Sequence, residues 1–205
     1  MVFSSRYNRI YKDNAIFSEE NRVLLIEEPI SLNKLAEKLY DKEVVTDTVE
    51  FIWAGNLLGW RKFRPGRYET GEGYDYDEFL SKLARGIQDE TNVTIIPGLD
   101  EGLISRNLGL QLQADSAAFV SIFSDSSSIA LEVGLTKNEI LGRMLPESYF
   151  FFWTTKPEDV IRRILNEFDR IVTRGLSEEI EKSGFTLNEV LTLASIVEWE
   201  AKVQD

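Results

Sequence analysis

The sequence of 205 residues contains no cysteine and no histidine. The absence of cysteine excludes disulfide bonds, thiolate zinc sites and thiol nucleophiles from this chain. The absence of histidine excludes serine–histidine and cysteine–histidine catalytic systems within it. Acid–base chemistry therefore falls to aspartate, glutamate, lysine or tyrosine.

An excess of positive charge and long apolar runs are also missing. Lysine and arginine number 23 against 35 acidic residues, a net charge of -12. This balance disfavours nucleic acid as a partner, because a phosphate backbone needs clustered cations, and it is most simply explained by solubility. No run of 18 apolar residues occurs and no signal peptide is evident, so we expect no membrane span here. Residues 1–20 are predicted to form a linker or a juxtamembrane arm.

The first half of the chain has the pattern of a small mixed domain. Apolar content of 43% with 28% charged residues is ordinary for a globular protein. Val23–Ile26 is predicted to be a buried strand, and Ser31 to cap a helix. A second helix is predicted over Thr48–Leu58. After the Pro-Gly turn and a short strand, Asp75 is predicted to open a third helix. Residues 21–90 thus give strand, helix, helix, strand, helix.

The second half is predicted to be mostly helical. A strand over Val93–Ile96 ends at Pro97 and Gly98, and residues 100–142 are helical with a serine-rich break at 125–128. An aromatic run at 146–153 is best explained as a core strand, and Pro157–Ile171 as a helix with an apolar stripe. The predicted fold class is therefore α+β.

The chain ends with an apolar helix over Thr186–Lys202. Thr186 and Glu189 have the spacing of a capping box, and Phe185 and Val190 that of a hydrophobic staple. This start fixes the helical register. At about 100° per residue, the apolar face is centred on the following residues: Val190, Ala194, Val197 and Ala201.

Two carboxylates, Glu198 and Glu200, fall on opposite flanks of that face, roughly 200° apart. They cannot act as the close pair of a retaining glycosidase, so a catalytic role would use one of them alone. An apolar flank would raise the pKa of such an acid and keep it protonated near neutral pH. The alternative is a surface acid paired with Lys202 or an N-terminal arginine. The helical projection does not separate the two.

Four stretches, in order along the chain, resemble the MltG/YceG-like endolytic murein transglycosylases. The terminal L-A-S-I-V-E-W-E-A, Leu193–Ala201, resembles the family's signature. F-R-P-G-R-Y, Phe63–Tyr68, with the helix after it, resembles a LysM-like subdomain. V-T-I-I-P-G, Val93–Gly98, resembles the strand and turn that follow, and L-P-E-S-Y, Leu145–Tyr149, the family's Pro-Asp/Asn-Thr-Tyr element.

The resemblance implies a small LysM-like module over 21–90 and the first part of a catalytic domain over 91–205. It implies a bacterial inner-membrane protein with a periplasmic catalytic region, which may be anchored by a segment absent here. The implied activity is internal cleavage of peptidoglycan glycan strands between MurNAc and GlcNAc, leaving 1,6-anhydroMurNAc ends. Glu200 would be the single acid–base residue and Glu198 would orient neighbours. No cofactor is implied. The implied partners are glycan strands and the cell-wall synthesis machinery.

The sequence departs from the family pattern in three ways. Position 199 is tryptophan rather than a charged residue, and position 147 is glutamate rather than aspartate or asparagine. The Asn-Arg, Gln-x-Asp-Pro-Thr and Tyr-Asn-Thr-Tyr elements that complete the substrate groove in the family do not occur. We therefore expect an incomplete enzyme with weak cleavage of its own.

Several residues are candidates for substrate binding. Tyr149, Glu147 and Trp199 belong to or adjoin the matching motifs, and Tyr68 lies in the LysM-like stretch. Sugars stack on aromatic rings, but packing in the core explains each aromatic residue equally simply. The acidic run at Asp75 lacks the framework of a calcium loop, so no metal site is predicted.

Two other functions compete with the transglycosylase. One is a non-catalytic module that binds peptidoglycan or the cell-wall synthesis machinery. The other is aminodeoxychorismate lyase, a label attached to similar sequences. That reaction needs pyridoxal phosphate, a Schiff-base lysine and a phosphate cradle, and the sequence offers no such constellation.

Overall fold

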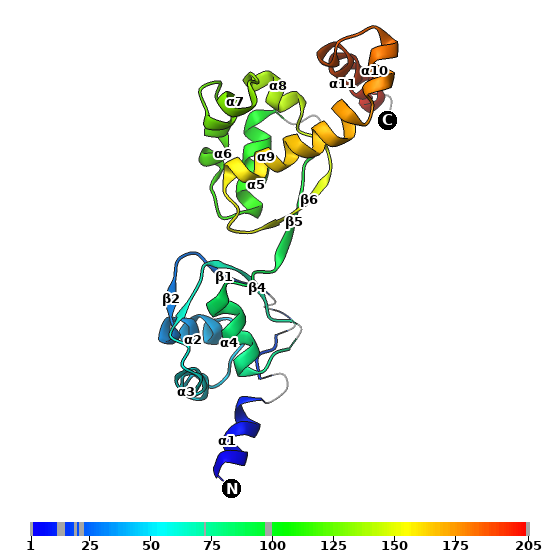
Figure 1. The fold of residues 1–205 in the computed structure, drawn as a ribbon. Helices are drawn as coiled ribbons and strands as arrows, with labels where there is room; N and C mark the ends of the chain where they lie inside the picture. Colours follow the sequence, from blue (N-terminus) through cyan, green and yellow to red (C-terminus); the bar gives the residue numbers. More distant parts are fainter. Residues whose placement is uncertain are drawn as a thin grey trace. The chain divides into compact units, whose positions relative to one another are not determined.

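The computed structural model describes residues 2–11, 15–18, 20, 23–71, 73–96 and 100–203. These residues divide into two compact units (Figure 1). The first unit lies within residues 1–90 and includes 152–154. The second comprises 91–151 and 155–205. Both contain helices and short strands, which confirms the α+β fold class.

The first unit has a β-α-α-β arrangement followed by a further helix. Its elements, in chain order, are α1 (Val2–Ile10), β1 (Val23–Ile26), β2 (Ile30–Ser31), α2 (Leu32–Asp41), α3 (Thr48–Leu58), β3 (Lys62–Phe63), β4 (Gly66–Glu69) and α4 (Tyr76–Arg85). Strand β1 pairs antiparallel with β4, from Val23 opposite Glu69 to Ile26 opposite Gly66. Helix α3 packs against α2 and α4.

Side-chain caps set the starts of these helices as the sequence predicts. The Ser31 hydroxyl accepts from the amide of Lys34 at the start of α2. Asp75 and Glu78 form a reciprocal capping box at the start of α4. Gly86 ends α4 with a φ of 75°, a left-handed conformation that glycine adopts without steric cost. The predicted helices over 32–41, 48–58 and 76–85 are therefore confirmed.

The core of the first unit is formed by the inward side chains of β1, β4 and the three helices. Its largest fully buried members are Tyr68, Phe51, Phe63, Phe79, Leu24, Ile26, Leu35, Leu39 and Leu80. Burial of this apolar surface is the main stabilising contribution to a unit of this size.

The N-terminal residues are more ordered than the predicted arm. Helix α1 lies against α3: Arg9 pairs with Glu50 at 3.2 Å, and its guanidinium lies 4.3 Å from the Trp53 ring centroid. Ile16 then exchanges two backbone hydrogen bonds, each 2.9 Å long, with Tyr74. These contacts join residues far apart in sequence, so no local pattern could predict them.

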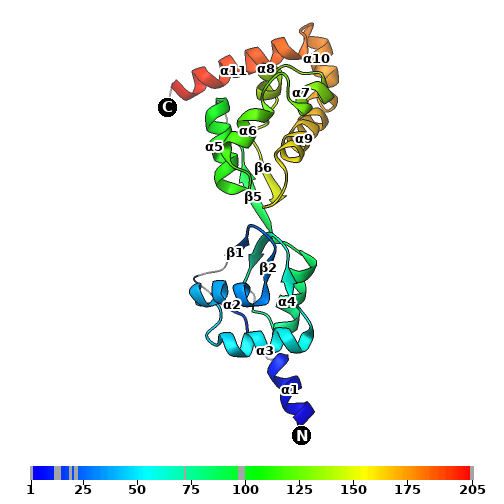
Figure 2. The ribbon, with the colours of Figure 1, turned by 90° about the vertical axis from the view of Figure 1, so that its left-hand side faces the viewer.

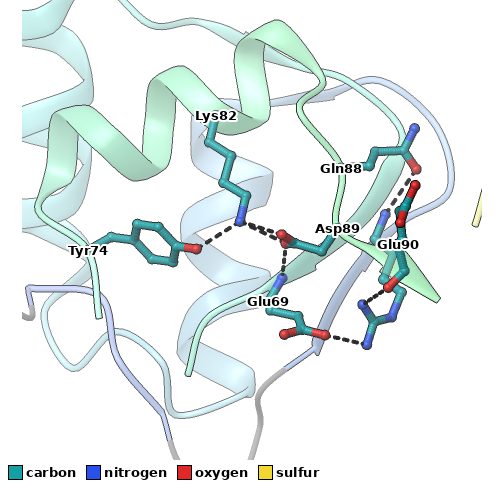
Figure 3. A network of polar contacts seen from close by, with 7 residues as sticks. Glu69, Tyr74, Lys82, Gln88, Asp89 and Glu90 are labelled. Carbon is teal, nitrogen blue, oxygen red and sulfur yellow. Dashed lines mark hydrogen bonds and ion pairs between the residues drawn. The ribbon is translucent and has the colours of Figure 1, made fainter. Parts of the chain in front are cut away.

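A polar cluster fixes the end of the first unit beside α4 (Figure 3). Lys82 Nζ donates to the Tyr74 hydroxyl at 2.8 Å and lies 2.7 Å from Asp89 Oδ2. The same Asp89 oxygen accepts the Glu69 amide of β4 at 2.6 Å. Burial lowers the pKa of Lys82, but the hydrogen bonds to Asp89 and Tyr74 outweigh it, so the pKa is raised. Gln88 Nε2 also donates to Thr154 Oγ1 at 2.8 Å.

The second unit carries one two-stranded sheet and most of the remaining helices (Figure 2). Its elements are β5 (Glu90–Thr94), α5 (Glu101–Gln111), α6 (Ser116–Ile122), α7 (Ser128–Val133), α8 (Lys137–Gly142), β6 (Ser148–Phe152), α9 (Pro157–Phe168), the π-helix η1 (Asp169–Arg174), α10 (Ser177–Ser183) and α11 (Leu187–Val203). Strand β5 pairs with β6. Helices α6 and α7 pack on α9.

Two predicted boundaries in this unit were wrong. Strand β5 runs over Glu90–Thr94 rather than Val93–Ile96, because pairing with β6 includes the polar residues that precede the apolar run. The predicted Pro97–Gly98 turn lies outside the described residues. Helix α9 ends at Phe168 and continues as a π-helix, whereas the sequence predicts a single α-helix to Ile171. The apolar stripe that predicts α9 stops at Phe168, where its buried face ends.

The core of the second unit lies between the sheet and the helices. Its members include Val93, Ile95, Leu108, Phe119, Phe123, Ile129, Ile140, Tyr149, Phe151, Val160, Ile161 and Ile164. Both strands contribute alternate residues to this core, so the opposite face of the sheet is turned away from it.

Candidate functional site

The candidate catalytic helix, α11, starts as the sequence predicts. Glu189 Oε2 accepts from the Thr186 amide at 2.7 Å and from its hydroxyl at 2.8 Å, which completes the capping box. These hydrogen bonds, the backbone one first, lower the pKa of Glu189. Gly184, with a φ of 74°, ends α10 just before this cap. Phe185 is half exposed, and Val190 is partly buried.

A second capping box ties α11 to α8. Thr136 and Glu139 form it at the start of α8, and Glu139 Oε1 also accepts from Asn188 Nδ2 of α11 at 3.1 Å. Hydrogen bonds from the Thr136 backbone, the Thr136 hydroxyl and Asn188 lower the pKa of Glu139 to about 2. The sequence spacing of Thr136 and Glu139 could have predicted the cap. The link to Asn188, 49 residues away, could not be predicted.

An apolar cavity of about 310 Å³ lies beside the first half of α11. Leu191, Ala194 and Ser195 of α11 line one part of it. The remaining lining comes from α5, α8, α9, η1 and the Leu145–Pro146 turn: Ile96, Ile104, Leu141, Gly142, Met144, Leu145, Pro146, Phe168 and Val172. The structure therefore brings two of the family-like stretches, the Leu145–Tyr149 element and α11, to the same cavity.

The far half of α11 is more exposed than its predicted apolar face suggests. Ala194 lines the cavity, but Val197 is 66% exposed, and Leu193 and Ile196 are about half exposed. The expectation that Val197 is buried was therefore wrong. The reason is that no described element packs against this part of the helix closely enough to cover it. Ala201 has no described side chain.

The two candidate acids lie near the end of α11. The Glu200 side chain is exposed, rather than half-buried on the flank of an apolar face. An exposed carboxylate can be reached by a polymeric substrate. The side chains of Glu198 and Trp199 lie outside the described residues, so their roles stay predictions.

Glu147 and Tyr149 occupy the start of β6, next to the cavity lining. The Glu147 side chain is exposed, and its carbonyl accepts from the Ile95 amide at 2.9 Å. Tyr149 is only 4% exposed, and its hydroxyl donates to the Leu145 carbonyl at 3.2 Å. Burial, with a smaller effect of Glu147, raises the pKa of Tyr149 to about 12. This placement supports the packing interpretation of Tyr149 and leaves Glu147 accessible.

Tyr68 lies in the first unit and has no exposed surface. Its hydroxyl lies 3.0 Å from the Arg64 carbonyl oxygen and 3.3 Å from that of Pro65. Burial raises the pKa of Tyr68 to about 12. In this structure Tyr68 holds the turn before β4 in place, and nothing in its placement supports substrate binding.

Metal and membrane features can be stated only for the described part of the chain. Within it, no three acidic side chains are grouped so that they could hold a metal ion. Nor does any helix there have the length and apolar character needed to cross a membrane.

Comparison with known proteins places the chain in a family. Residues 24–205 match the YceG-like family, and the chain belongs to it. Its fold is similar to the 2.6 Å crystal structure of a YceG-like protein from Listeria monocytogenes, with a TM-score of 0.50 and 20% sequence identity. The similarity covers 87% of this chain and 64% of the Listeria chain. No curated protein matches the sequence.

Proposed function

We propose that this protein is an endolytic lytic transglycosylase that cleaves the MurNAc–GlcNAc bonds of peptidoglycan, with Glu200 as its acid–base residue. The observation that carries the proposal is the position of Glu200. It stands exposed on α11, the helix with the family-like signature, in a chain that belongs to the YceG-like family. The absence of histidine and cysteine restricts proton transfer to groups of this kind.

One carboxylic acid suffices for the proposed reaction. The protonated acid donates its proton to the glycosidic oxygen as the bond between that oxygen and C1 breaks. The resulting carboxylate then takes the proton of the sugar's own 6-hydroxyl while that oxygen bonds to C1. The products are a free hydroxyl end and a 1,6-anhydro end, and no water is consumed. Neither a metal ion nor an organic cofactor takes part.

The setting of the enzyme is part of the same proposal. The substrate is a peptidoglycan glycan strand, and the site of action is the periplasmic face of a bacterial inner membrane. Partners from the cell-wall synthesis machinery fit this location. Because the chain spans 64% of the length of the Listeria protein, these statements concern the whole protein.

The test compares wild type with Glu200→Gln and, as a matched control, Glu198→Gln, each prepared with any residues that flank this chain in its gene. Uncrosslinked glycan strands are incubated with each protein, and product ends are identified by mass spectrometry. We expect anhydro ends from wild type and a loss of roughly 100-fold or more in Glu200→Gln, the usual contribution of a general acid–base group.

The control decides between the two acids. Glu198→Gln is expected to retain anhydro-end formation, because that residue is proposed only to orient its neighbours. Equal cleavage by wild type and Glu200→Gln, with loss in Glu198→Gln, would move the acid to Glu198. If wild type binds the strands but forms no anhydro ends, the transglycosylase proposal fails and a non-catalytic peptidoglycan-binding module takes its place.

A further inference from the structure

The aromatic run after the Leu145–Pro146 turn is divided between two environments. Tyr149 and Phe151 are each 4% exposed and belong to the core of the second unit. Between and beyond them on the same strand, Phe150 is 56% exposed and Phe152 is 47% exposed. Side chains alternate between the faces of a strand, so the two exposed rings point the same way, about 7 Å apart along β6.

Strand β5 adds polar groups to the same outward face. Its exposed side chains include Asn92 and Thr94, while Val93 between them is buried in the core. The hydroxyls of Thr94 and Ser148 lie 3.0 Å apart, which places the outward residues of both strands on one face. We call the side chains of Asn92, Thr94, Ser148 and Phe150 the ribbon face, and Phe152 continues it along β6.

The ribbon face combines exposed aromatic rings with hydroxyl and amide groups. An aromatic ring carries partial negative charge on its faces and attracts C–H groups placed over it. Hydroxyl and amide side chains both donate and accept hydrogen bonds. A pyranose ring has the matching chemistry, because C–H groups cover its faces and hydroxyls surround its rim.

Other occupants match this chemistry less well. Outward positions of β5 and β6 hold no lysine or arginine, so a polyanion such as nucleic acid would find no cation there. The two rings are flanked by polar groups rather than by further apolar side chains, unlike a large hydrophobic patch for a protein or membrane. The remaining competitor is a second copy of this chain, which could pair with an open edge of the two-stranded sheet.

We propose that the ribbon face is a subsite for a β-linked amino-sugar strand, with one sugar stacked on Phe150 and the next contact made by Phe152. This inference rests on the proposed function, since it concerns the glycan that Glu200 would cleave. It assigns binding to residues outside the cleavage chemistry. The hydroxyls of Thr94 and Ser148 and the amide of Asn92 would hydrogen-bond the rim of the stacked sugar.

The experiment titrates the chain with tetra-N-acetylchitotetraose, a soluble β-1,4-linked amino-sugar probe, and follows amide chemical shifts by NMR. The variants are Phe150→Ala, Phe152→Ala and the conservative Phe150→Tyr. Leu131→Ala serves as the matched control, because Leu131 is a 73% exposed apolar residue of α7. Both phenylalanines are about half exposed, so the alanine variants are expected to fold, which the NMR spectra check directly.

We expect each alanine variant to raise the Kd roughly 3- to 10-fold, the range of a single aromatic contact. Phe150→Tyr is expected to stay within about twofold of wild type, because the ring is kept, and Leu131→Ala to equal wild type. Shift changes should be centred on β5 and β6. Equal affinity in wild type and Phe150→Ala, or no binding by wild type, would overturn the subsite. So would a dimer of the wild type that Phe150→Ala dissolves, since the face would then belong to a second copy.

The outcome can be separated from that of the proposed function. If wild type forms anhydro ends but Phe150→Ala binds and cleaves unchanged, only the ribbon face is wrong. If the subsite is right and the enzyme is active, Phe150→Ala should raise KM for glycan strands and leave kcat unchanged. If no anhydro ends form but binding still depends on Phe150, the subsite stands and the transglycosylase fails.

Discussion

The polar cluster around Lys82 gives a prediction that can be worked out from the structure. Lys82→Met keeps most of the aliphatic stem but removes the ammonium group that contacts Asp89 and Tyr74. The side chains of Lys82 and Asp89 are 13% and 30% exposed, so water can replace only part of what is lost. The Asp89 carboxylate then keeps its bond from the Glu69 amide but has no cation beside it.

The expected loss of stability is about 2–3 kcal/mol. A hydrogen bond to a charged group contributes about 1.5–3 kcal/mol, and breaking a fully buried ion pair costs about 3–5 kcal/mol. The partial exposure of Asp89 places this pair below the buried limit. At an m value of about 1 kcal/mol/M for a unit of this size, the urea midpoint should fall by about 2–3 M. The raised pKa of Lys82 means that its contribution is complete below about pH 10 and is lost only above it.

Tryptophan fluorescence is the suitable assay, because Trp53, Trp60 and Trp153 all belong to the first unit. The control is Lys34→Met on α2, an exposed lysine of the same unit, expected within about 0.5 kcal/mol of wild type. The Lys82→Met, Asp89→Asn double variant should recover part of the loss, because it removes the uncompensated carboxylate. A midpoint for Lys82→Met equal to that of Lys34→Met would refute the reasoning.

Two further predictions concern the second unit. The pKa of Glu139, about 2 against an ordinary 4.5, means that its stabilising contribution is complete above about pH 4.5 and is lost as the pH falls towards 2. Circular dichroism melts should show this acid loss in wild type but not in Glu139→Gln, and equal acid dependence would contradict it. Phe151→Ala should cost about 3–4 kcal/mol and Phe150→Ala less than about 0.5 kcal/mol in urea unfolding; the reverse order would refute the assigned faces of β6.

Much of the secondary structure could be predicted because its determinants are local. The caps at Ser31 and Asp75 act on amides within three residues, and Gly86 ends α4 by its own conformational freedom. The same holds for Thr186 and Glu189 at the start of α11. Such interactions depend little on the rest of the fold, so the sequence is enough to predict them.

The candidate site could be predicted only in part. The sequence motif indicates Glu200 and the helix that carries it, and the composition restricts proton transfer to acids, lysine or tyrosine. The sequence could not predict that Tyr68 and Tyr149 are buried while Phe150 is exposed. Alternation requires neighbouring residues of β6 to face opposite ways, but which set faces the core depends on the helices that pack there.

By itself, the sequence determined the helix starts, the family and the single-acid chemistry, because each of these depends on residue types at short spacing. Only the tertiary structure decided which residues meet across long separations, such as Ile16 with Tyr74 and Asn188 with Glu139. It also decided that the Leu145–Pro146 turn and α11 line one cavity. The physical reason is that such contacts form only when packing brings distant segments together, and no pattern within one segment specifies its distant partner.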